Sequence, residues 1–175
     1  MPCTLTGSQP LDCKDSVGGI RELKVKVHPG ATTIANDFTI DSSGVVTAIA
    51  SGSRNTWYTY ELEKETTSVN VTGQYNPQNG TTWYQQEIKL IMNKLSARLF
   101  YEFDQMAKAR ILVAIRDFND VYMLFGLDFG CDVTAATMGS GTGRGDRSGY
   151  EVTLMGKEKR LTPTITAAIW NTLIS

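Results

Sequence analysis

Residues 96–117 read SARLFYEFDQMAKARILVAIRD, and this stretch decides the fold class. In its first part, apolar residues recur on one side of a helix, which predicts an amphipathic helix over about 96–109 with Ser96 as its N-cap. These apolar residues are Leu99, Phe100, Phe103, Met106 and Ala107. Residues 111–115 are continuously apolar, as in a strand that is covered on both faces. Because strand patterns flank this one helix, we expect a mainly β protein, a β-sandwich or barrel with one flanking α-helix.

Residues 66–94 predict a long β-hairpin. Thr and Val dominate its first strand, the run Asn76-Pro77-Gln78-Asn79-Gly80 is a strong turn signal, and apolar residues alternate along its second strand. The tip is polar and the root is apolar, so we expect the hairpin to project beyond the core. A projecting hairpin has exposed strand edges, which are a liability unless another chain covers them.

The rest of the chain predicts a single β domain over 20–160, flanked by extended terminal arms at 1–19 and 161–175. The N-terminal arm is polar and contains several Pro and Gly residues, so a disordered tail is the alternative interpretation. In the first strand, Leu23, Val25 and Val27 are expected to face the core and Lys24 and Lys26 the solvent. Further along, Val133 and Ala135 are expected to face inward, and residues 139–149 to form a flexible glycine loop.

Composition excludes several classes of function. Seventeen Lys and Arg against eighteen Asp and Glu give a net charge of -1, which argues against tight binding to a phosphate backbone. No apolar run approaches the roughly 20 residues that span a bilayer, and the N-terminus has no signal-peptide pattern. Cys3, Cys13 and Cys131 have neither the number of a disulfide framework nor the spacing of a zinc site. We therefore expect a protein made and kept in a cytoplasm, with no membrane partner.

Several motifs could suggest catalysis or ligand binding, but a structural role explains each of them better. His28 is the one histidine and precedes a Pro-Gly turn, so a Ser-His-Asp arrangement would depend on this surface residue. The glycine run at 139–145 lacks the Lys-Ser/Thr end of a phosphate loop and leads into a strand. Within it, Arg144-Gly145-Asp146 matches a cell-adhesion tripeptide that often occurs by chance. Four aspartates could suit calcium or glycoside hydrolysis, but turn positions favour backbone bonding for the first two. They are Asp117, Asp120, Asp128 and Asp132. We expect no enzyme, no cofactor, no metal and no small-molecule substrate.

Aromatic residues concentrate around the hairpin, and three interpretations stay open for them. They are Trp57, Tyr58, Tyr60, Tyr75, Trp83 and Tyr84. Such residues form cross-strand pairs and cores, anchor subunit interfaces, or line carbohydrate platforms. The hairpin and the glycine loop supply the candidate residues for a subunit interface. These candidates are Trp57, Tyr75, Asn76, Gln78, Asn79, Trp83, Arg144 and Arg147.

Several short runs resemble a known class of protein. The runs are GTTWYQQEIKL at 80–90, KARILVAIRD at 108–117, FGLDFG at 125–130, SGYEVTL at 148–154 and CKDSVGGI at 13–20. With the helix between them, they are similar to small virion structural proteins of tailed bacteriophages, particularly those that infect Bacteroidetes. The order of elements also resembles the tail tube fold, which is shared with the tube proteins of contractile injection systems.

The resemblance implies a phage tail tube subunit. Six copies would form a ring, rings would stack into a hollow tube, and the 66–94 hairpin and the arms would reach the next ring. Double-stranded DNA would pass without specific binding through a weakly acidic lumen, and other tail proteins would be further partners. Charges on the polar face of the sheet would line it: Glu61, Glu63 and Glu87 with Lys24, Lys26 and Lys89. The location would be the virion tail, assembled in the host cytoplasm.

Two alternatives remain at this point. Another virion component with a similar fold is the nearer one: a tail terminator, a tube-initiating ring or a capsid decoration protein. Self-polymerisation into long tubes distinguishes a tube subunit from these. A carbohydrate-binding β-sandwich that uses the Trp and Tyr cluster is the second, and it predicts a stable monomer.

Overall fold

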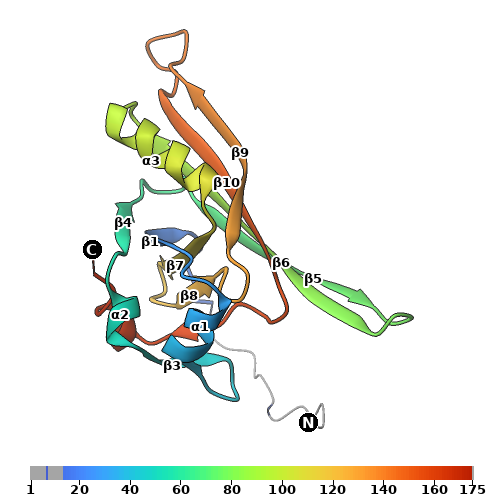
Figure 1. Cartoon of the computed structure of the whole chain (residues 1–175). Helices are drawn as coiled ribbons and strands as arrows, with labels where there is room; N and C mark the ends of the chain where they lie inside the picture. The colour runs from blue at the N-terminus through green and yellow to red at the C-terminus, as the bar shows by residue number, and fades with distance from the viewer. Residues whose placement is uncertain (1–6, 8–13, 175) are drawn as a thin grey trace.

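The computed structural model describes residue 7 and residues 14–174, and the protein is mainly β, as expected (Figure 1). Strands hold 46% of the residues and helices 17%. The strands are β1 Ile20–Val27, β2 Phe38–Ile40, β3 Val45–Ile49, β4 Tyr58–Glu61, β5 Ser68–Asn76, β6 Thr81–Asn93, β7 Ile111–Asp117, β8 Tyr122–Phe125, β9 Cys131–Gly139, β10 Gly149–Glu158 and β11 Thr164–Ile165. The helices are α1 Ala31–Asp37, α2 Ser51–Arg54, α3 Ala97–Lys108 and α4 Ala167–Trp170.

The sheet is mixed and is organised around β7. On one side β7 pairs with β1, which carries β4 at its outer edge, and on the other side it pairs with β8, followed by β11, β3 and β2. The start of β7 also meets β9 through the pair Ile111 and Cys131, and from β9 the sheet continues through β10 and β6 to β5. Strand β11 runs parallel to β3, and the other pairs are antiparallel.

A first hydrophobic core lies on one face of β7. Alternate side chains of β7, those of Ile111, Val113 and Ile115, pack there with residues of β1, β6 and β10 and with α3. Since β6 and β10 belong to the other branch of the sheet, the two branches face each other across this core. This face-to-face arrangement is how a sheet buries its apolar side chains.

A second core lies on the opposite face of β7. Leu112 and Ala114 point into it and meet apolar residues of α1, β3, α4 and the segment before β4. The five residues 111–115 are therefore all buried, which confirms the prediction from their continuous apolar run.

The helix α3 confirms the predicted amphipathic helix. Ser96 caps it, because the Oγ of Ser96 accepts a hydrogen bond from the backbone N–H of Leu99 at 3.3 Å. Its buried stripe is narrower than expected: Phe103 and Met106 are buried, whereas the side chain of Phe100 is 59% exposed. The helix contacts the first core along one line of residues, so only positions on that line are covered.

Two expectations about the ends and the helices are wrong. The helix is not alone, since the chain also forms α1, α2 and α4, and α1 and α4 contribute Ile34 and Trp170 to the second core. Residues 161–174 are not an extended arm, because β11 pairs with both β3 and β8, and Trp170 and Leu173 are buried. The apolar residues of α1 and of residues 161–174 follow only a weak pattern, because each of these segments buries only one side against the sheet.

The predicted N-terminal arm falls mostly on residues 1–6 and 8–13, which lie outside the described part of the chain. Its last residues contact the turn between β7 and β8. The backbone N–H of Val17 donates to Oδ1 of Asn119 at 2.8 Å, and Nδ2 of Asn119 donates to the carbonyl oxygen of Val17 at 2.7 Å. The chain is thus tied to the domain before β1 begins.

Lys24 and Lys26 are buried rather than solvent-facing, which corrects their assignment as lumen charges. Nζ of Lys24 donates to the carbonyl oxygens of Trp170 and Leu173 at 3.2 and 2.9 Å, and Nζ of Lys26 to those of Ser53 and Asn55 at 3.1 and 2.9 Å. Desolvation lowers the pKa of both ammonium groups. Their stems pack between β1 and the second core, and their charges bind carbonyls at and after the ends of α4 and α2. Val27, at the end of the strand, is exposed instead.

A β-bulge in β9 explains why the predicted inward orientation of Ala135 is wrong. Val133 is partly buried, as expected, but Ala135 is exposed. The pairing of β9 with β10 shifts between Thr153 and Leu154, which pair with Ala135 and Val133. The extra residue, Thr134, reverses the alternation beyond it, so Ala135 changes face.

Candidate interaction surfaces

The β5–β6 hairpin extends away from both cores (Figure 1). Its strands pair from Ser68 with Lys89 to Asn76 with Thr81, which confirms the predicted hairpin over 66–94. Among the described residues, β5 pairs only with β6, so one backbone edge of this nine-residue strand has no strand partner. An open edge of this length is a template for pairing with another chain.

The tip of the hairpin is a tight polar turn. Oδ1 of Asn76 accepts hydrogen bonds from the backbone N–H groups of Gln78 and Asn79 at 3.1 and 3.2 Å. Gly80 has a φ of 63°, a left-handed conformation that favours glycine at the end of the turn. Three of the predicted interface residues, Asn76, Gln78 and Asn79, are therefore together and exposed here. Their role in assembly stays a prediction.

Aromatic side chains lie along the outer half of the hairpin. Tyr75 is 66% exposed, and its ring meets that of Tyr84 edge-on with centroids 6.2 Å apart. The Tyr75 ring lies across Gly73, where a Cβ atom would collide with it. Nζ of Lys157 lies 5.4 Å from the centroid of the Trp83 ring. The structure thus places the predicted residues Tyr75 and Trp83 on the surface near the tip residues.

Trp57 does not belong to this surface, and its assignment to a subunit interface is wrong. Its side chain is 0% exposed and packs in the second core. Its indole Nε1 donates to the carbonyl oxygen of Ser53 at 2.9 Å, so its polar atom is satisfied within the domain. Trp57 lies just before the start of β4, and from there a large apolar ring can reach the second core beneath β1.

The glycine loop is organised by one carboxylate. Oδ2 of Asp146 accepts from the backbone N–H groups of Thr142 and Gly143 at 2.9 and 2.7 Å, which lowers the pKa of this carboxyl. The carboxylate is thereby engaged within its own loop, which argues against adhesion recognition through Arg144-Gly145-Asp146. Arg144 is exposed, and Nη2 of Arg147 contacts Oε2 of Glu151 at 3.1 Å. The predicted residues Arg144 and Arg147 thus lie at the β9–β10 hairpin, apart from the tip of the β5–β6 hairpin (Figure 1).

Three of the four aspartates form separate structural contacts. Oδ1 of Asp117 accepts from the N–H groups of Asn119 and Val121 at 2.9 and 2.7 Å, as expected for a turn residue. Asp120 forms an ion pair with Arg116 at 2.6 Å. Asp128 is paired with Arg160, and Asp132 is exposed on β9. Groups of three or more metal-ligating side chains are absent from the described residues.

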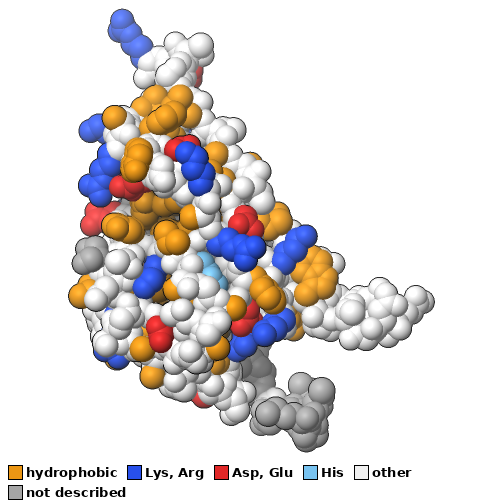
Figure 2. Space-filling model, in the orientation of Figure 1, with side chains coloured by type: hydrophobic (Ala, Val, Ile, Leu, Met, Phe, Trp, Pro, Cys, Tyr) orange, Lys and Arg blue, Asp and Glu red, His pale blue; other side chains and the backbone are white. Residues whose placement is uncertain are grey.

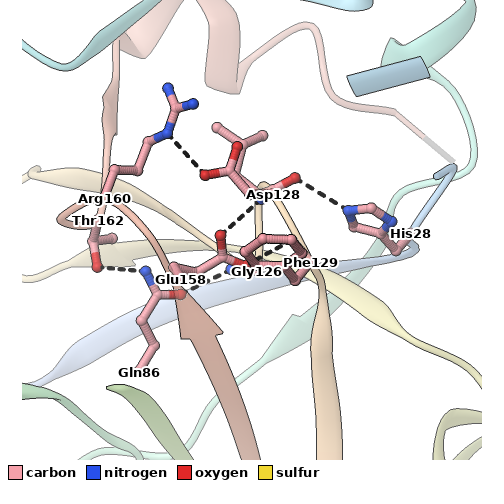
Figure 3. A network of polar contacts seen from close by, with 9 residues as sticks. His28, Gln86, Gly126, Asp128, Phe129, Glu158, Arg160 and Thr162 are labelled. Carbon is pink, nitrogen blue, oxygen red and sulfur yellow. Dashed lines mark hydrogen bonds and ion pairs between the residues drawn. The ribbon is translucent and has the colours of Figure 1, made fainter. Parts of the chain in front are cut away.

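A polar network that sequence reasoning missed holds the turn between β8 and β9 (Figure 3). The carboxylate of Glu158 accepts from the backbone N–H groups of Asp128 and Phe129 at 2.9 and 3.0 Å. Oε1 of Gln86 accepts from the N–H of Gly126 at 2.9 Å, while its Nε2 donates to Thr162 at 3.0 Å. The sequence did contain a signal for Glu158. Tyr150, Val152 and Leu154 alternate on the buried face of β10, and continuing this alternation past residue 156 places Glu158 on the same face.

His28 and Arg160 complete this network. Nε2 of His28 lies 3.1 Å from the carbonyl oxygen of Leu127, and its Nδ1 accepts from the N–H of Gly30. Nε of Arg160 donates to Oδ2 of Asp128 at 2.9 Å. Burial raises the pKa of Glu158, since desolvation outweighs its two backbone hydrogen bonds. The donors and acceptors of these side chains are paired within the network, which holds the turn between β8 and β9 in place.

No helix in the described part of the chain has the length and apolar character to cross a membrane. Comparisons of the chain with known protein families, with curated proteins and with solved structures found no match.

Proposed function

We propose that this protein is a subunit of a phage tail tube. Copies assemble into rings, which we expect to be hexameric, and rings stack into a conduit for genome delivery. The observation that carries the proposal is the β5–β6 hairpin, which extends beyond both cores with an unpaired backbone edge and a polar tip. A strand edge of this kind is stabilised when a neighbouring copy pairs with it or covers it.

The charges support a conduit rather than a nucleic-acid binder. The net charge of -1 provides no global excess of cations for counterion release from DNA. Lys24 and Lys26 are engaged by backbone carbonyls and are not available to phosphates. Double-stranded DNA would therefore pass without specific binding. The partners would be further copies and other tail proteins, and the site of action the virion tail, assembled in host cytoplasm.

The alternatives have less support. A carbohydrate platform needs several exposed aromatic rings on one face, and Trp57 and Tyr60 are buried in the two cores. We propose a structural role without catalysis, in which the polar clusters hold turns. A terminator, a tube-initiating ring or a decoration protein would form a ring or bind a shell without polymerising.

Negative-stain electron microscopy of the purified protein across a concentration series tests the proposal. We expect hollow tubes of regular rings at high concentration. Single rings that do not stack at any concentration would favour the terminator or the initiating ring. A monomer that neither forms rings nor copolymerises with preformed tail tips would contradict the proposal.

A further inference from the structure

A basic surface lies where the β5–β6 hairpin leaves the body. It consists of Arg110, Lys157 and Lys159, three side chains without an ion-pair partner among the described residues. Phe129 is 51% exposed in its middle, with Nζ of Lys159 5.9 Å from its ring centroid. Figure 2 shows basic and hydrophobic side chains near the base of the hairpin, with acidic side chains among them.

Two shallow hollows flank Phe129 within this surface. Arg110, Lys157 and Asp132 line one of about 410 Å³, and Lys159, Asp128 and Arg160 line the other, of about 390 Å³. Four cations thus face two carboxylates, and Asp128 is already bound by Arg160. The surface therefore presents excess positive charge around an exposed aromatic ring, which suits an acidic protein segment.

An acidic edge of the same chain has the complementary charge. It consists of Glu22 on β1 with Glu61, Glu63 and Glu65, which end β4 and continue into the following loop, interrupted by Lys64. None of the four carboxylates has an ion-pair partner among the described residues.

The backbone pairing adds a second reason to expect a partner at the acidic edge. Glu22 and Glu61 are directly opposite each other, an arrangement of like charges that destabilises a strand pair. Arg116, on the other side of Glu22, is engaged by Asp120. Strand β4 pairs only with β1 among the described strands, so its outer backbone edge is open to a neighbour.

The two surfaces lie on different sides of the body. In Figure 1, β4 is on the left of the body, whereas β10 runs down to the right, where the β5–β6 hairpin leaves the body. They cannot neutralise each other within one subunit, but they can meet between two copies arranged head to tail. We infer that the acidic edge of one copy docks on the basic surface of the next copy. This contact is heterologous, as ring closure requires, and it rests on the proposed self-assembly.

Charge reversal on each surface tests the contact. One variant carries Lys157→Glu and Lys159→Glu, a second carries Glu61→Lys and Glu63→Lys, and a third combines all four changes. Sedimentation analysis of each, with circular dichroism to check the fold, measures the self-association constant. Lys94→Glu is the charge-reversal control, since Lys94 is exposed, has no ion-pair partner among the described residues and lines neither hollow.

We expect each reversed surface to weaken self-association by about tenfold or more, because attraction becomes repulsion. The fourfold variant, and an equal mixture of the two single-surface variants, should recover association, since opposite charges meet again. The control should associate as the unchanged protein does. Without recovery, or with association unchanged by either reversal, the inference is wrong while the proposed self-assembly stands. An unchanged protein that stays monomeric throughout would contradict both.

Discussion

Strands β7 and β5 illustrate two opposite situations within one sheet. Strand β7 is paired on both edges and covered on both faces, so all five residues 111–115 are buried. Strand β5 is paired on one edge, and most of its outer half is exposed. The domain is therefore stabilised around β7 and by the inner half of the hairpin, where Ile88 and Leu90 of β6 are buried, whereas neither core includes the outer half of the hairpin. The hairpin is available for contact with another molecule.

The substitution Phe103→Asp should have the largest effect on the body. Phe103 packs in the first core from α3, and an aspartate there loses the buried ring and desolvates a carboxylate, at a cost of about 5 kcal/mol or more. We expect loss of the folded subunit in urea denaturation followed by circular dichroism. Phe100→Asp, at an exposed position of the same helix, should fold normally. A Phe103→Asp variant with an unchanged midpoint would show that this helix face is not required.

Two of the three tryptophans, Trp57 and Trp83, give the most direct contrast between core and hairpin. Trp57→Ala removes a fully buried ring and should lower the free energy of unfolding by about 3–5 kcal/mol. Trp83→Ala, on the outer half of the hairpin near its tip, should cost less than about 1 kcal/mol, as expected for a partly exposed residue. Equal losses in thermal and urea denaturation would remove the distinction between the two regions.

The substitution Lys24→Met should have an intermediate effect. It keeps much of the aliphatic stem but removes the Lys24 donor from the carbonyl oxygen of Leu173 and one of the two donors from that of Trp170, which costs about 1–3 kcal/mol. Lys159→Met, at an exposed position, should leave the free energy of unfolding nearly unchanged. If the Lys24 variant were as stable as the unchanged protein, these bonds would contribute nothing to the docking of α4.

A small, pH-dependent effect is expected at Asp146. Its backbone hydrogen bonds lower the pKa of the carboxyl below the usual 3.8, so its stabilisation is present above that value. The stabilisation is lost as the pH falls through the lowered pKa. Carboxyl chemical shifts in NMR should show titration below that of an ordinary aspartate, and Asp146→Asn should alter loop signals at neutral pH. A normal titration would contradict the described loop.

Local patterns predicted the central elements well. The helix over 96–109, the hairpin over 66–94 and the doubly covered strand at 111–115 each have a periodicity or turn signal that depends on few neighbours. The assignment of outer strands depended on tertiary context. Lys24 and Lys26 alternate as solvent-facing residues should, yet short helices beyond β1 supply carbonyls that bind their ammonium groups.

The candidate surface was predicted in part. The tip residues Asn76, Gln78 and Asn79 follow from turn chemistry, and they are exposed together. Trp57 was assigned to the interface wrongly, because the local sequence around an aromatic residue beside a strand is the same whether the residue lies in a core or at an interface. Glu158 was missed because a carboxylate usually marks the surface, and here two backbone N–H groups accommodate it. Burial of this kind depends on contacts distant in sequence.

Electron microscopy of a shortened hairpin tests the central claim most directly. Gln74 and Trp83 are paired, so residues 75–82 can be replaced by a two-residue Asn-Gly turn without changing the register. We expect this variant to keep the circular dichroism spectrum and the denaturation midpoint of the unchanged protein, because both cores are intact. Under conditions in which the unchanged protein forms tubes, it should give isolated rings or short stacks. Tubes of normal length from a folded variant would contradict the assembly role of the hairpin.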